Sequence, residues 1–168
     1  MHSHKKPGFV LLPWLGFVCA ASLLAQESRP ITTKELVERA QKIVVGEVIK
    51  QHSAWDDLGR EIYTYSTLRV QRIIKSERAD SILIIRQLGG KAGNIESHVA
   101  GAPRFATGER VLLMLGPYAG TPYHDLIDWY EGKYSIKTDA NRGEVLSGNG
   151  AGHGQRVEEF MATLRRYL

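Results

Sequence analysis

The sequence predicts a mainly β fold, a small antiparallel Greek-key barrel of five to six strands that is OB-like in its order of parts. Short β-branched or alternating runs are separated by turn residues throughout the chain. The runs follow one another too closely for parallel crossovers, which need a dozen or more residues. Near the C-terminus, apolar residues repeat at helical spacing instead. We therefore expect one domain over residues 26–168, with a short N-terminal helix and a C-terminal amphipathic helix.

The first 25 residues predict a secretory signal peptide. A basic start at residues 4–6 precedes an apolar run over residues 9–24 and then the small residue Ala25. Pro13 interrupts this run, which is shorter than the roughly 20 residues of a membrane-spanning helix. We expect cleavage after Ala25, a secreted or periplasmic location, and no stable membrane insertion of the mature chain. An uncleaved anchor is the alternative.

The charge and the cysteine count exclude several classes of function. The chain has 22 basic and 18 acidic residues, and removal of Lys5 and Lys6 would leave 20 basic residues and a net charge of +2. So small and mixed a charge argues against nucleic acid as a partner. Cys19, the only cysteine, lies in the signal peptide. The mature chain is thus expected to have no disulfide, no thiolate metal site and no cysteine nucleophile.

The N-terminal part of the domain predicts a helix and then a strand. Thr32 and Glu35 have the spacing of a capping box, which predicts a helix over 33–41. The β-branched run 43–49 follows and predicts a strand. Gly46 within this run indicates a bend or a close approach of another backbone.

The next run completes a long hairpin. Turn residues at 55–60 lead into residues 62–75, where apolar and polar side chains alternate. The alternation slips at Ile73-Ile74, which is typical of a bulge or a strand end.

The rest of the chain predicts further strands, a long loop and a terminal helix. Residues 81–88 are nearly all apolar and are expected to be a central strand. A loop over 91–108 follows. The remaining predicted strands are 109–115, 126–130 and 133–137, with a stub at 145–146. A helix over 155–168 places five apolar residues on one face, and we expect it to cover the core: Val157, Phe160, Met161, Leu164 and Leu168.

Several motifs occur in order between residues 43 and 116: IVVGEV at 43–48, WDD at 55–57 with IYT at 62–64, RQLGG at 86–90, and GAPRF at 101–105 with GERV at 108–111. In these motifs the chain resembles a group of uncharacterised bacterial proteins that carry signal peptides. Its order of parts is similar to the netrin-like or tissue-inhibitor-of-metalloproteinase-like version of the OB barrel. The resemblance implies a barrel outside the cytoplasm. Inhibitors of that class chelate the zinc of a protease through an N-terminal cysteine, which this chain lacks without Cys19, so the resemblance does not imply that mechanism.

We predict no catalytic residue, no metal ligand and no cofactor, and hence a protein that is not an enzyme. The four histidines of the mature chain are isolated in sequence, and His124-Asp125 with Asp128 fits a polar turn better than a ligand cluster. Asp56-Asp57 lacks the further acidic ligands of a calcium loop. Gly89-Gly90 is followed by neither a Lys-Ser/Thr pair nor a helix, so a phosphate loop is not expected there.

Binding residues are expected on two surfaces. Tyr63, Tyr65 and Arg69 lie on the outer face of the strand 62–75, and Arg104 and Phe105 lie in the loop 91–108. Tyrosine and arginine are enriched where proteins bind one another. We therefore predict a non-catalytic secreted or periplasmic binding module with a protein partner. Two alternatives stay open: a protease inhibitor that acts through loop 91–108 without cysteine chelation, and a hydrolase whose catalytic residues are dispersed in sequence.

Overall fold

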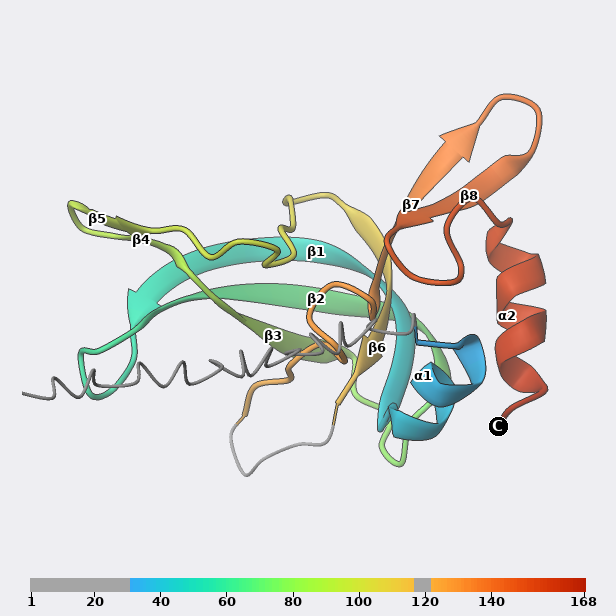
Figure 1. Ribbon diagram of the computed structural model, residues 1–168, viewed down its shortest axis with the longest axis horizontal. Coiled ribbons are helices and arrows are strands. Elements are labelled where there is room, and N and C mark those ends of the chain that lie inside the picture. The colour runs from blue at the N-terminus through green and yellow to red at the C-terminus, as the bar shows by residue number, and fades with distance from the viewer. Residues whose placement is uncertain (1–30, 117–121) are drawn as a thin grey trace, which may run out of the picture.

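Six antiparallel strands form the main sheet, in the order β3-β2-β1-β6-β7-β8 (Figure 1). The computed structural model describes residues 31–116 and 122–168. The predicted signal peptide, with Cys19, lies outside these residues. The strands of the main sheet are β1 Lys42–Trp55, β2 Ile62–Lys75, β3 Ile82–Leu88, β6 Arg110–Leu115, β7 Lys133–Asp139 and β8 Gly143–Gly148. The mainly β, antiparallel fold is thus confirmed.

The long hairpin of β1 and β2 is the frame of the sheet. Its register runs from Ile43 opposite Lys75 to Trp55 opposite Ile62. Between Ile43 and Val44 the register skips Ile74, at the irregularity that the sequence predicts for Ile73-Ile74. β1 continues beyond the predicted end at residue 49 because pairing with β2 satisfies its backbone even where its side chains are polar. Gly46 marks the predicted close approach, since a Cβ atom there would lie 2.5 Å from the Arg69 carbonyl oxygen.

The named strands do not close into a barrel, so the barrel predicted from the sequence is not confirmed at that level. The sheet ends at β3 on one side and at β8 on the other. β3 was expected to be central and lies at an edge instead. Its apolar sequence is explained by a short segment that covers part of this edge, because Ile85 bridges His124 in parallel and Leu115 bridges Leu126 in antiparallel fashion.

Two connections differ from the sequence prediction. Of residues 126–130, predicted as a strand, only Leu126 pairs with β6. Residues 127–132 form a turn in which Asp128 (φ 44°) and Trp129 (φ 57°) are left-handed. The predicted loop 91–108 begins with a small hairpin, β4 Gly90–Ala92 and β5 Ile95–Ser97. This hairpin lies against the distal ends of β1 and β2.

Two helices pack at the opposite end of the molecule, beside the β7–β8 hairpin (Figure 1). α1 (Thr33–Arg39) has the predicted capping box, with the Glu35 amide donating to the Thr32 hydroxyl at 3.2 Å. α2 (Val157–Arg165) buries four of its five predicted apolar residues, whereas Leu168 lies beyond its end and is exposed. No helix in the described part of the chain is long and apolar enough to cross a membrane.

The core is divided between the two faces of β1 and β6. Ile43 and Val45 face one cluster together with the helices, while Val44 and Val48 face a second cluster together with β2 and β3. β1 and β6 are therefore apolar on both faces, which explains the unbroken β-branched run in β1.

Candidate functional site

A groove opens where β3 leaves its covering segment. It has a volume of about 320 Å³, and we call it the aromatic groove. Its lining comes from β2, β3, the segment after β5 and the turn after residue 124: Tyr63, Arg86, Gln87, Leu88, Pro103, Asp125, Leu126 and Trp129. This volume lies at the small end of the range of about 300–1,000 Å³ for ligand pockets.

Trp129 forms one wall of the groove and stays half exposed to solvent. A left-handed backbone is unusual for a bulky aromatic residue and costs about 1–3 kcal/mol. A two-pronged ion pair secures this turn, because the Arg39 guanidinium donates to both carboxylate oxygens of Asp128 at 2.5 and 2.7 Å. The fold thus holds the Trp129 ring at the surface even though the backbone conformation of this residue is unfavourable.

The lining of the groove also includes a charged pair beside an aromatic ring. Arg86 donates to both carboxylate oxygens of Asp125, at 3.2 Å from Nε and 2.9 Å from Nη2. This pairing raises the pKa of Arg86. The guanidinium also lies 5.0 Å from the ring centroid of Tyr63, within the range of a cation–π interaction.

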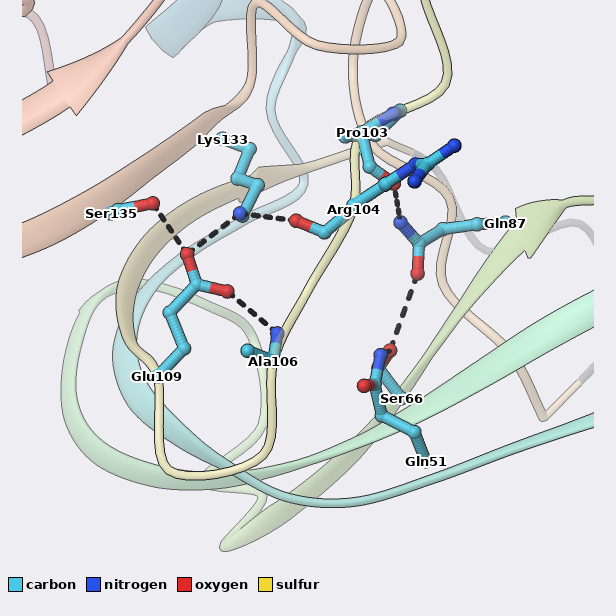
Figure 2. A network of polar contacts seen from close by, with 9 residues as sticks. All are labelled: Gln51, Ser66, Gln87, Pro103, Arg104, Ala106, Glu109, Lys133 and Ser135. Atoms are coloured by element: carbon cyan, nitrogen blue, oxygen red, sulfur yellow. Dashed lines mark hydrogen bonds and ion pairs between the residues drawn. The ribbon is translucent and has the colours of Figure 1, made fainter. Parts of the chain in front are cut away.

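Polar contacts fix the segment that supplies Pro103 (Figure 2). The side-chain amide of Gln87 donates to the Pro103 carbonyl, and its oxygen accepts from the Ser66 hydroxyl at 3.2 Å. Gln51 donates to Ser66 at 2.9 Å and extends the chain of contacts to β1. The wall of the groove at Pro103 is therefore held in place without a ligand.

A second set of contacts fixes the same segment from β6 and β7 (Figure 2). Glu109 accepts from the Ala106 amide at 2.9 Å, from Lys133 at 2.8 Å and from the Ser135 hydroxyl. Lys133 also donates to the Arg104 carbonyl at 2.5 Å. Burial raises the pKa of Glu109, but these hydrogen bonds outweigh it and leave the pKa below its usual value.

The five binding residues predicted from the sequence fall in different places. Tyr63 lines the aromatic groove. Arg69 is six residues further along β2, about 20 Å away at the rise of a strand. Arg104 lines an adjoining cavity of about 250 Å³ that shares Gln87, Leu88 and Pro103 with the groove.

Tyr65 and Phe105 have roles inside the fold. Tyr65 is only 9% exposed, since Tyr123 lies 4.7 Å and His52 lies 5.1 Å from it, centroid to centroid. Burial raises the pKa of its hydroxyl. Phe105 packs against the second core cluster, with the Lys133 ammonium 4.6 Å from its ring centroid.

Sequence reasoning missed Arg86, Leu126 and Trp129. All three were assigned to strands, and one of these strands does not exist. A usable signal was the absence of β-branched residues other than Ile127 between Asp125 and Gly132, in a stretch with Asp128 and Gly132 as turn formers. No sequence pattern connects this turn to Tyr63 in β2, because the fold alone brings them together.

Another cavity, of about 510 Å³, lies beside the start of β1 and β3, and the polar groups that line it pair with one another. Its buried Lys42 donates to Asp80 at 2.6 Å and to Ser76 at 3.0 Å. This pairing lowers the pKa of Asp80, and burial, followed by the nearby Lys42 charge, lowers the pKa of His124. The hydrogen bonds from Lys42 to Asp80 and Ser76 stabilise the start of β1.

The two acidic residues at the groove and its turn pair with different arginines. Asp125 pairs with Arg86 and Asp128 pairs with Arg39, so they do not share a site with His124. Among residues 31–116 and 122–168, no three metal-ligating side chains come together. No protein-family model matches the chain, and no curated protein matches it either.

Proposed function

We propose that this protein is a non-catalytic module of the extracytoplasmic space that binds a protein partner through the aromatic groove. The observation that carries this proposal is Trp129, which is half exposed, left-handed and braced by Arg39 against Asp128. Tryptophan, tyrosine and arginine dominate the energetics of protein interfaces, and the groove brings Trp129, Tyr63 and Arg86 together.

Binding fits the groove better than catalysis does. Arg86 and Asp125 neutralise each other, and Gln87 is engaged at both ends of its amide. A catalytic group needs an open partner for the substrate and an environment that shifts its pKa toward the working pH. The side chains of Arg86, Asp125 and Gln87 are thus committed to the fold, which leaves the apolar side chains and the backbone of the groove for recognition.

An OB-like barrel is the finer form of the proposed fold. β1, β2, β3, the segment 124–127 and β6 follow one another around a ring. The segment pairs with both neighbours, since the His124 amide donates to the Ile84 carbonyl at 2.8 Å and the Gly116 amide donates to the Asp125 carbonyl at 3.0 Å. This ring supports the barrel and the netrin-like order of parts proposed from the sequence.

The groove is tested with the protein produced from its full sequence and a phage-displayed library of random linear peptides. We expect the selected peptides to carry an apolar or aromatic anchor. We expect Trp129→Ala to weaken their binding at least about 30-fold, the effect of losing a tryptophan hot spot. Isothermal titration with the synthetic peptides measures the affinities.

Trp55 provides the matched control for this experiment. It is 41% exposed, comparable to Trp129 at 50%, but lies outside the groove at the end of β1. Trp55→Ala is expected to leave peptide binding unchanged. A library that yields no binder, or binders that Trp129→Ala does not affect, would remove the groove from the proposal.

The proposed compartment has its own test. In a bacterial host that expresses the full sequence, we expect the chain in the periplasm or the medium. Its intact mass should be that of residues 26–168. Such a chain would contain no thiol, because Cys19 is removed with the leader. A product that retains residues 1–25 and stays with the membrane would favour the uncleaved anchor.

A further inference from the structure

We infer that the occupant of the aromatic groove is an extended segment of a partner protein that pairs as an added strand with the free edge of β3 and carries acidic residues next to its apolar anchor. This inference rests on the proposed function and specifies its partner.

Hydrogen-bond alternation shows which backbone groups of β3 face this edge. The Gly89 amide donates to the Ile62 carbonyl at 2.7 Å, so Gly89 faces β2, and Leu88 before it faces away. The Arg86 amide donates to the His124 carbonyl at 2.9 Å, so Arg86 also faces away from β2. In a strand, the amide and the carbonyl of one residue point to the same side.

The covering segment satisfies only the first part of this edge. It takes the Ile84 carbonyl and the Arg86 amide, and then Leu126 turns away to pair with Leu115. Within the described residues, no hydrogen bond reaches the Arg86 carbonyl or the Leu88 amide. Both groups belong to residues that line the groove. The groove therefore contains one acceptor and one donor at the spacing that an added strand requires.

The walls of the groove specify the rest of the segment. An apolar side chain from an added strand would meet Leu126, Trp129 and Tyr63. Beyond Leu88, the adjoining cavity is lined by Lys91 and Arg104. Glu96 lines the same cavity opposite Lys91 and lies 3.1 Å from His98. Among the described residues, neither Lys91 nor Arg104 forms an ion pair, and both side chains are exposed. Acidic residues in the partner would complement them.

Blocked hexapeptides of the pattern Thr-X-Thr-X-Glu-Glu and the reverse order are the probes, with Val, Leu or Phe at X. We expect at least one peptide to bind the full-length protein, and we expect Trp129→Ala to lower its affinity about 30-fold. N-methylation of the peptide amide that meets the Arg86 carbonyl should weaken binding at least about fivefold. Exchange of the Leu88 amide, followed by NMR, should slow when the peptide binds.

Leu88 also gives a matched pair of variants. Leu88→Pro removes the outward amide without removing a bond to β2, and Leu88→Ala keeps the amide while shortening the side chain. We expect the proline variant to bind at least about fivefold more weakly than the alanine variant. Replacing both glutamates by glutamine, or Arg104→Ala, should weaken binding about two- to fivefold.

The outcomes separate the two proposals. If the peptides bind in a Trp129-dependent manner, but N-methylation has no effect and the Leu88 amide exchanges as before, strand addition is wrong and the groove stands. If no peptide binds, both fail. If Leu88 exchange instead slows with protein concentration and sedimentation shows a dimer, the edge pairs with a second copy, which overturns the partner named here.

Discussion

At the scale of single residues, the Glu109 carboxylate connects two parts of the chain that are distant in sequence. Its bonds reach the backbone at Ala106 and the side chains of Lys133 and Ser135, so it joins the segment 102–109 to β7. Glu109 and Lys133 are mostly buried, with 18% and 12% of their side chains exposed. A pair with so little solvent depends on the presence of both partners.

Glu109→Gln should therefore destabilise the fold by about 2 kcal/mol, since it leaves the mostly buried Lys133 ammonium without a negative partner. Urea unfolding measures the change. Glu144→Gln is the control, because Glu144 pairs with Arg110 where both side chains are 40% or more exposed, and its loss should cost under about 1 kcal/mol. Equal losses of unfolding free energy in the two variants would contradict this stabilising role of Glu109.

Tyr134 predicts a loss of stability in alkali. Burial raises the pKa of its hydroxyl to about 12, whereas the unfolded chain titrates near 10.0. As the pH rises from 10 to 12, the unfolded state releases this proton first, so the free energy of unfolding should fall by up to about 3 kcal/mol. Tyr134→Phe should show a smaller fall over this range. Unfolding curves with the same pH dependence in both proteins would contradict this role.

At the scale of elements, α2 closes one face of the core. Phe160 is fully buried, and its ring centroid lies 5.3 Å from that of Tyr134. A Cβ atom at Gly152 would lie 2.8 Å from the Phe160 ring, which shows how tightly the preceding loop packs on the helix.

Phe160→Ala should lower the free energy of unfolding by about 3–5 kcal/mol because it leaves a cavity between α2 and β7. Leu168→Ala, at a residue that is 57% exposed, should change it by less than about 0.5 kcal/mol. Thermal melts of both variants provide the comparison. If Phe160→Ala has the same melting temperature as the wild type, α2 does not pack on the core as described.

The elements that could be predicted from the sequence are those with a local cause. The capping box of α1, the alternation of β2 and the apolar stripe of α2 depend on neighbours within a few residues. β3 and the 127–132 turn could not be placed in this way. An apolar run is equally suited to a central strand and to an edge that another segment covers. The turn at Asp128 and Trp129 is stabilised by Arg39 of α1, which is distant in sequence.

At the scale of the whole molecule, the candidate site is a product of the strand order. Tyr63 was predicted because its own strand alternates, but Arg86 and Trp129 join it only when β3 and the turn meet at one edge. Arg69, predicted from the same alternation, lies on the same face of β2 but outside this groove. Alternation specifies a face, and only the tertiary pairing specifies which part of that face is hollow.

The central place of β1 also sets the pace of folding. β1 can form its hairpin with β2 early, but its other edge waits for β6, which the chain reaches only after β3, β4 and β5. Such non-local pairing is typical of domains that fold in milliseconds to seconds. Until β6 pairs with β1, the backbone groups along this edge of β1 are open and can pair with another chain. We therefore expect the pairing of β6 with β1 to be the step that removes this edge from contact with other chains.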